Sequence, residues 1–171
     1  MESAVTLRNS RTLYASDRLR LAEETFATPD GAVCRPAIHH PGAVAIIACP
    51  TLDHLLLVRQ YRYPLRRWTV EIPAGTVNAG EDPLTTARRE LTEETGWSAT
   101  DWQECLRYVP AAGISDEVLT VFRAEGLRPG AAAPEQGELV SPVVWSRAEL
   151  RQRLQDAGPV DAKTLIALAW L

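Results

Sequence analysis

Three glutamates near the middle of the chain have the spacing of a metal-binding helix face. Glu90, Glu93 and Glu94 lie at positions i, i+3 and i+4, so they share one face if this segment is helical. Like charges this close together repel one another and need a compensating charge. Carboxylate oxygens suit a hard cation such as Mg²⁺, which proteins usually hold together with substrate phosphates. The spacing therefore indicates a phosphate-handling metal site, and the alternative is an acidic helix face that contacts only solvent.

The segment 83–95 carries the signals of a helix that would position these glutamates. Asp82 is a cap-type residue, Pro83 occupies the first helical position, and Gly96 follows the last turn. Arg89 lies beside the glutamates, where its guanidinium group could hold one of them in a metal-binding rotamer. A second face of this helix is apolar and can pack on a sheet; it holds Leu84, Ala87 and Leu91.

The remaining elements predict an α+β fold in which a mixed sheet is flanked by helices. Strands and helices follow one another without a regular βαβ alternation, which argues against a Rossmann sheet. Gly75 follows the predicted strand 68–72, and a glycine there would let the backbone approach a metal or ligand closely. The other expected strands span residues 11–16, 19–27, 32–38, 43–49, 54–60, 102–109, 117–124 and 140–145, and the other expected helices span residues 146–157 and 161–171.

Composition excludes several classes of protein. The 171 residues are 46% hydrophobic and 23% charged, as expected of a globular domain with a short arm. The net charge of −4 argues against a nucleic-acid partner. No apolar run is long enough to cross a membrane, and residues 1–13 lack the apolar core of a signal peptide. The three cysteines are widely spaced, so a reducing cytoplasm is the expected location.

The segment 75–97 resembles the Nudix box at every position that the motif specifies. With ordinary residue usage, a match of this kind arises by chance about once in 10⁹ registers. We therefore reject the reading of a merely solvated acidic helix. The matching residues are Gly75, Glu81, Arg89, Glu90, Leu91, Glu93, Glu94, Gly96 and Trp97.

This resemblance implies a Nudix fold, an α/β/α sandwich, and hydrolysis of a nucleoside diphosphate linked to another group. The implied cofactor is Mg²⁺, with Mn²⁺ as a possible substitute. Arg89 would orient the glutamates, and Glu81 would be a loop carboxylate that supports them. The implied metal ligands are Glu90, Glu93, Glu94 and the backbone carbonyl of Ala74.

A further carboxylate should act as general base. Glu94 is one candidate, but in several Nudix enzymes the base lies in a distant loop. The loop 128–138 offers Glu135 and Glu138. We favour Glu138, because it stands just before a predicted strand and can be held firmly; the alternative is that both are solvated loop carboxylates.

The flanking segments look like the ADP-ribose pyrophosphatase branch of the Nudix superfamily. The similarity covers residues 40–44, 58–64 and 71–75 together with the box. In that branch, N-terminal strands help to build a homodimer, so residues 1–40 are expected to form a dimerisation arm and residues 41–171 the catalytic domain. Arginines clamp the diphosphate and ribose there; the matching residues are Arg62, Arg59 and, less closely, Arg35.

The residue types themselves allow other roles for several of these side chains. Arg59 and Arg62 could instead form ion pairs on a loop. Trp68 could stack on a base or pack in the core. Lys163, the only lysine, starts the last predicted helix, where local ion pairing is expected.

The loop after the box departs from the branch pattern. Ala112 stands where a proline is expected, and Pro110 comes two residues early. Because this loop is thought to touch the terminal ribose, the resemblance does not decide the identity of the second half of the substrate. Glu117 could contact the substrate or metal, or only cap the next strand. The alternatives to ADP-ribose are another nucleoside diphosphate derivative, a specialised metabolite diphosphate, or a Nudix module that binds a nucleotide without cleaving it.

Overall fold

The computed structural model describes residues 5–156 and 160–170, which form two compact units. Of the described residues, the first unit contains 5–42 and 108–119, and the second contains 43–107, 120–156 and 160–170. No helix within the described ranges is both long enough and apolar enough to cross a membrane.

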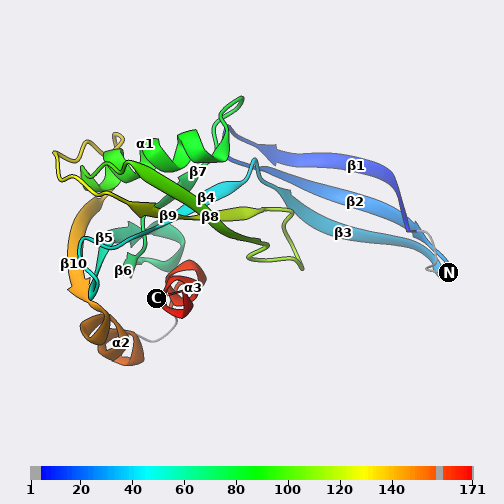
Figure 1. The fold of residues 1–171 in the computed structure, drawn as a ribbon. Helices are drawn as coiled ribbons and strands as arrows, with labels where there is room; N and C mark the ends of the chain where they lie inside the picture. Colours follow the sequence, from blue (N-terminus) through cyan, green and yellow to red (C-terminus); the bar gives the residue numbers. More distant parts are fainter. Residues whose placement is uncertain (1–4, 157–159, 171) are drawn as a thin grey trace. The chain divides into compact units, whose positions relative to one another are not determined.

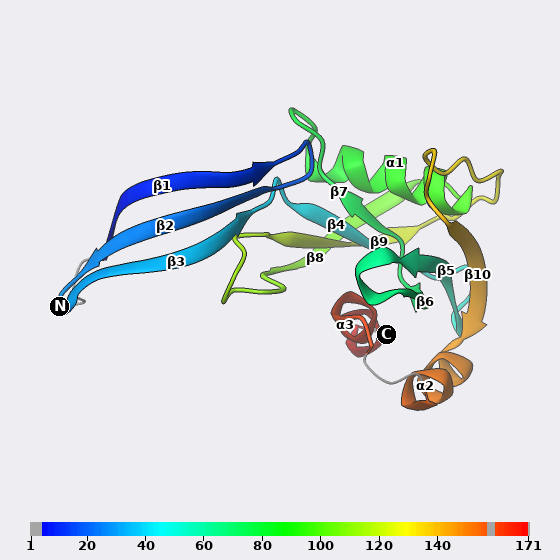
Figure 2. The ribbon, with the colours of Figure 1, turned by 180° about the vertical axis from the view of Figure 1, so that it is seen from behind.

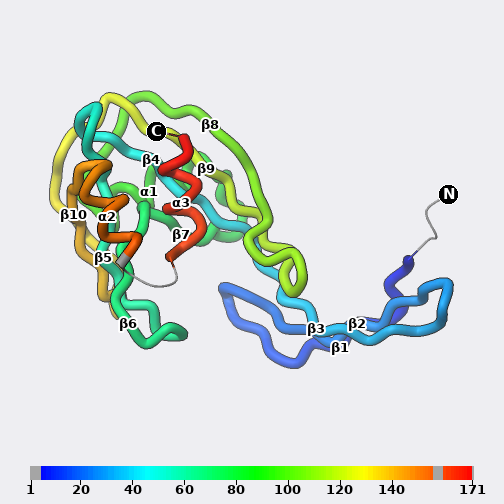
Figure 3. The backbone as a smooth tube through the Cα atoms, turned by 90° about the horizontal axis from the view of Figure 1, so that it is seen from below, coloured from blue at the N-terminus to red at the C-terminus, as the bar shows by residue number. Residues whose placement is uncertain are grey.

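The first unit is a three-stranded antiparallel sheet. It consists of β1 (Thr6–Ala15), β2 (Arg20–Thr28) and β3 (Gly31–His39), three successive passes of the chain that Figure 3 follows as a tube. Gly31, where β2 turns back into β3, has φ +119°, a region open chiefly to glycine. Strand β1 begins five residues before the predicted start. The sequence did not indicate this part of the strand, because its exposed residues show no hydrophobic alternation.

The second unit contains two sheets and three helices, so the predicted α+β class is confirmed. One sheet has the strand order β7-β4-β9-β8 and the other the order β10-β5-β6. Helix α1 packs against β4 and β7, and α2 and α3 lie on the opposite side of the strands (Figures 1 and 2). The elements are β4 (Ala43–Ala48), β5 (His54–Arg62), β6 (Arg67–Glu71), β7 (Ala74–Thr76), α1 (Pro83–Thr95), β8 (Asp101–Tyr108), β9 (Leu119–Glu125), β10 (Val140–Ser146), α2 (Arg147–Asp156) and α3 (Ala162–Ala169), with a single 3₁₀ turn at Tyr63–Leu65.

The apolar face of α1 is buried on the sheet, as the sequence predicts. Ala87 and Leu91 are fully buried, and Leu84 packs against the same cluster. Every residue of β4 is buried, which agrees with its near-continuous apolar run. Burying one leucine side chain contributes about 2 kcal/mol, so this face strongly favours a single rotation of the helix about its axis. That rotation leaves Glu90 and Glu93 partly exposed and buries Glu94 beside the apolar residues.

Both predicted ends of α1 are confirmed. The Asp82 side chain accepts hydrogen bonds from the backbone N–H groups of Leu84 (3.0 Å) and Thr85 (3.1 Å). Gly96 ends the helix at φ 76°, and its N–H donates to the carbonyl of Thr92 at 2.8 Å. A Cβ on Gly96 would lie 2.5 Å from the backbone nitrogen of Ala132, so only glycine lets the loop after β9 lie this close to the helix.

Candidate active site

Arg89 binds three glutamates of the box at once. Its Nε and Nη2 each lie 3.1 Å from the carboxylate oxygens of Glu81. Its Nη1 donates to Glu90 at 2.8 Å and to Glu93 at 3.0 Å. These contacts, led by the hydrogen bonds to Glu81, raise the pKa of Arg89 above its usual value. One planar guanidinium group therefore sets the directions of three carboxylates, and Glu81 anchors it from the loop before the helix.

Glu94 is buried, unlike the other two glutamates of the helix. Its side chain is almost fully buried and accepts a hydrogen bond from the backbone N–H of Ala74 at 3.0 Å. Burial raises the pKa of Glu94 to about 8, and the negative charges of Glu90 and Glu138 contribute in the same direction. Burial also raises the pKa of Glu90, to about 6. Burial and the neighbouring carboxylates thus outweigh the effect of Arg89 on Glu90 and of Arg62 on Glu94.

Gly75 makes room for Glu90. A Cβ atom built at position 75 would lie 1.9 Å from both Cδ and Oε1 of Glu90. The group that lies against this glycine in the structure is a carboxylate of the same site. The approach of a metal or ligand to the backbone at Gly75 stays a prediction. In Gly75→Ala, the side chain of Glu90 could therefore not keep its observed position.

The donor set of this site suits a divalent cation. It consists of carboxylate oxygens, two of them with raised pKa values caused first by burial, so a hard cation would supply the charge that the site lacks. Within residues 5–156 and 160–170, no three His, Cys, Asp or Glu side chains are already grouped as a metal cage. Arg89 and the Ala74 N–H hold the carboxylates instead.

Glu138 comes close to this site from a distant part of the chain. It precedes β10, as the sequence indicates, and its charge raises the pKa of both Glu90 and Glu94. Its backbone N–H donates to the carbonyl of Glu135 at 3.1 Å, which closes a turn just before the strand. Glu138 is half-buried, whereas Glu135 is exposed.

The four residues predicted to bind substrate lie in three different places. Arg62 ends β5, and its positive charge acts on Glu94. Arg59 lies three positions earlier, so strand alternation places it on the opposite face of β5. Arg35 and Glu117 belong to the first unit, where Arg35 donates to the carbonyl of Cys34 and the Glu117 N–H donates to Ser115. The structure therefore brings Arg62, and not Arg59, to the glutamates.

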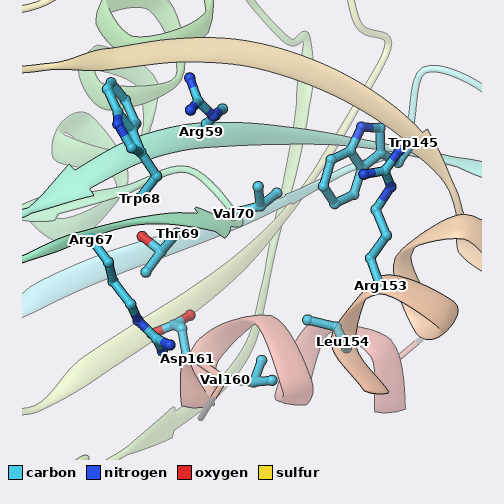
Figure 4. Close-up of a pocket in the computed structure, with 10 residues that line it drawn as sticks. All are labelled: Arg59, Arg67, Trp68, Thr69, Val70, Trp145, Arg153, Leu154, Val160 and Asp161. Atoms are coloured by element: carbon cyan, nitrogen blue, oxygen red, sulfur yellow. The ribbon is translucent and has the colours of Figure 1, made fainter. Parts of the chain in front are cut away.

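Arg59 lines a cavity of about 190 Å³ on its own face of the sheet. Its guanidinium carbon lies 4.0 Å from the ring centre of Trp68, which is 44% exposed and therefore outside the core. At the other end of the cavity, Arg153 stacks on Trp145 in the same way (Figure 4). These are cation–π pairs between neighbouring side chains.

Arg62 has a buried partner that sequence reasoning missed. Its Nε and Nη2 donate to the two oxygens of Glu71, at 2.9 and 2.6 Å. Burial alone would raise the pKa of Glu71, but the hydrogen bonds and charges of Arg62 and Lys163 outweigh it and lower this pKa to about 2. Lys163 pairs with Asp161 at 2.9 Å, which confirms the expected local pairing, and it also contacts Glu71. No local spacing links Glu71 to a lysine 92 positions away.

Comparison with known proteins identifies the family. A family model described as the NUDIX domain matches residues 39–168. The chain is 34% identical over 162 residues to the methanol dehydrogenase activator of Bacillus methanolicus, covering 93% of this chain and 88% of that protein. The identity and both coverages are the same for the ADP-ribose pyrophosphatase of Bacillus subtilis (strain 168).

A solved structure, described as the crystal structure of ADP compounds hydrolase, shares the fold. Its TM-score to this chain is 0.78 at 24% identity, and the match covers 96% of this chain and 90% of that one. The fold and the intact box agree with the family model over most of the chain. This chain belongs to the Nudix domain family.

Proposed function

We propose that this protein is a Mg²⁺-dependent Nudix hydrolase that cleaves the diphosphate of ADP-ribose, or of a related nucleoside diphosphate sugar, to AMP and a sugar phosphate. The observation that carries the proposal is the set of three carboxylates on α1, directed by Arg89 and Ala74 and more numerous than the one arginine that binds them. A relative named ADP-ribose pyrophosphatase, 34% identical over almost the whole chain, supports this substrate class.

Nudix hydrolases generally use divalent metal ions, and the donors proposed to hold them here are Glu90, Glu93, Glu94 and the carbonyl of Ala74. A bound Mg²⁺ would supply charge neutralisation of the diphosphate and a lower pKa for bound water. Mn²⁺ is a possible substitute, because it also prefers oxygen ligands.

The chain's own residues prepare the site in three ways. Arg89 holds Glu90 and Glu93 by fixed hydrogen bonds, so these carboxylates lose little freedom when a ligand arrives. Arg62 ends β5 with its charge directed at the same site and is proposed to bind a phosphate. Glu138 is proposed as the general base that removes a proton from the attacking water, with Glu94 as the other candidate.

The remaining assignments concern the first unit. We propose that the strands of residues 1–40 form a dimerisation arm and that Arg35 and Glu117 contribute to substrate binding from this unit. The exposed face of β1 supports an arm that is available to a second copy. Cys34, Cys49 and Cys105 are free thiols, which agrees with the proposed cytoplasmic location.

A second candidate is a Nudix hydrolase that acts on a different diphosphate derivative. Two relatives with the same identity and coverage carry different names, so overall similarity does not select the substrate. Ala112, in place of the proline expected in the ADP-ribose branch, favours a change in the part of the pocket that meets the second half of the substrate.

The test is product release from a panel of diphosphates, with Mg²⁺ and with EDTA. The panel contains ADP-ribose, NADH, FAD, GDP-mannose, diadenosine polyphosphates and nucleoside triphosphates. We expect Mg²⁺-dependent release of AMP from ADP-ribose to exceed all other activities, and the Glu94→Gln variant to serve as the control for contaminating hydrolases. Preference for another member would favour the second candidate. A folded protein that is inactive on the whole panel would contradict hydrolysis of these substrates.

A further inference from the structure

Lys163 lies in a buried ion-pair network next to the glutamate site. It is the second residue of α3, and only 8% of its side chain is exposed. Its ammonium group contacts Oε2 of Glu71 and lies 2.9 Å from Oδ1 of Asp161. A buried lysine without partners would be strongly unfavourable, so these two carboxylates hold it in one place.

Glu71 connects this lysine to Arg62. Its Oε1 accepts hydrogen bonds from Arg62 at 2.9 Å and from Thr69 at 2.5 Å. Its Oε2 accepts from Arg62 at 2.6 Å and from Lys163. These four donors use the hydrogen-bonding capacity of the carboxylate, so Glu71 cannot rotate without breaking at least one contact. The orientation of Arg62 is therefore tied to the position of Lys163.

The next residue of α3 holds the backbone between Glu71 and the site. The buried Oγ1 of Thr164 accepts a hydrogen bond from the N–H of Ile72 at 3.0 Å. Two residues later, Ala74 donates its N–H to Glu94. The first turn of α3 is thus connected to the site in two ways. Lys163 reaches the Arg62 side chain through Glu71, and Thr164 binds the backbone segment that leads to Ala74.

Arg62, Glu71 and Lys163 line one cavity of about 390 Å³. Only Nε and Nη2 of Arg62 bind Glu71, so the guanidinium group retains N–H donors for an anion. Glu71 and Asp161 together balance the charges of Arg62 and Lys163, so what the network offers an anion is the fixed direction of the remaining N–H donors of Arg62. This arrangement can present a fixed positive group to a phosphate.

We propose that Lys163 is a positioning residue for the proposed phosphate contact of Arg62, acting through Glu71. The inference rests on the proposed function of this site. Lys163 makes no contact with substrate in this scheme. It fixes the carboxylate that fixes the guanidinium group, so its removal should weaken substrate binding much more than turnover.

The experiment is a kinetic cycle on the full chain with Lys163→Met, Lys163→Arg, Arg62→Ala and the double variant Arg62→Ala/Lys163→Met. We expect Lys163→Met to raise KM about tenfold and to change kcat by less than about threefold. Lys163→Arg should restore most of the wild-type KM, because it keeps the charge and the donors. In the Arg62→Ala background, Lys163→Met should cause no further rise in KM, because the group it positions is gone.

Controls separate positioning from folding. Leu165→Ala changes a half-exposed residue of the same helix and should leave KM unchanged. Thermal unfolding followed by circular dichroism checks that each variant folds, and Lys163→Gln replaces Lys163→Met if the latter does not. KM effects that multiply in the double variant would overturn the inference while leaving the proposed function intact. A wild-type protein that turns over no member of the substrate panel would overturn the proposed function, and with it this inference.

Discussion

The contact between Gly75 and Glu90 allows a sharp test of the site. In Gly75→Ala, the new methyl carbon would lie 1.9 Å from Cδ and Oε1 of Glu90, whereas ordinary contacts begin at 3.4 Å. The carboxylate must therefore retreat by about 1.5 Å. Position 75 needs no glycine for its backbone conformation, because its φ is not in the left-handed region. The substitution is thus a displacement of Glu90 and little else.

The size of the expected effect follows from that displacement. A misplacement of about 1 Å in a catalytic constellation can lower the rate by about 10²-fold. We expect Gly75→Ala to lower kcat/KM at least that much, which corresponds to about 2.7 kcal/mol of transition-state stabilisation. Overpacking of this kind also destabilises the fold, by about 1–3 kcal/mol. The matched control for the stability effect is Gly113→Ala, whose new methyl group would meet no atom within 4 Å.

A double-mutant cycle identifies Glu90 as the cause. In a Glu90→Ala background the colliding carboxylate is absent, so Gly75→Ala should cost little further stability in urea unfolding. The two destabilisations should then be non-additive by about 1 kcal/mol or more. An equal cost of Gly75→Ala in both backgrounds, or wild-type kcat/KM in the single variant, would refute the reasoning.

Three further predictions follow from the same geometry. Glu94→Gln should lower kcat at least about 10²-fold, and saturating Mg²⁺ should raise the unfolding temperature of the wild type more than that of this variant; equal shifts would remove Glu94 from the metal site. The pKa of Glu71 is lowered from 4.5 to about 2, so its charge stabilises the fold above about pH 4.5. This contribution, about 3 kcal/mol, is lost as the pH falls toward 2. Urea unfolding of Glu71→Gln should lack this part of the pH dependence, and a profile equal to that of the wild type would contradict the pairing. Gly96→Ala should destabilise the protein by more than Gly80→Ala, because both glycines have positive φ but only Gly96 lies against another backbone segment. Equal decreases in unfolding temperature for the two variants would show that the contact with the loop 130–132 contributes nothing.

Local features of the site could be predicted from the sequence. The limits of α1, its apolar face and the shared face of three glutamates all depend on residues within four positions of one another. Helical geometry alone brings such residues together. The position of Arg89 among Glu90 and Glu93 follows for the same reason, because all three lie within about one turn.

The opposite faces of Arg59 and Arg62 could also have been predicted, because they lie three positions apart in one strand. Alternation along a strand separates residues at odd spacing. The resemblance predicts substrate binding for both arginines. Strand geometry distinguishes them, because it places them on opposite faces of β5. Trp68 likewise lies on the face of Arg59, where it forms a cation–π pair and stays outside the core.

What the sequence alone determined is therefore the helix that carries the glutamates and the family to which the chain belongs. Only the tertiary structure decided that Gly75 accommodates Glu90, that Glu138 approaches the site, and that Glu71 joins Arg62 to Lys163. These contacts join residues between 9 and 92 positions apart, and no local periodicity encodes them. They arise when burial of the apolar faces of α1 and β4 brings distant polar groups together, and each buried charge must then find a partner.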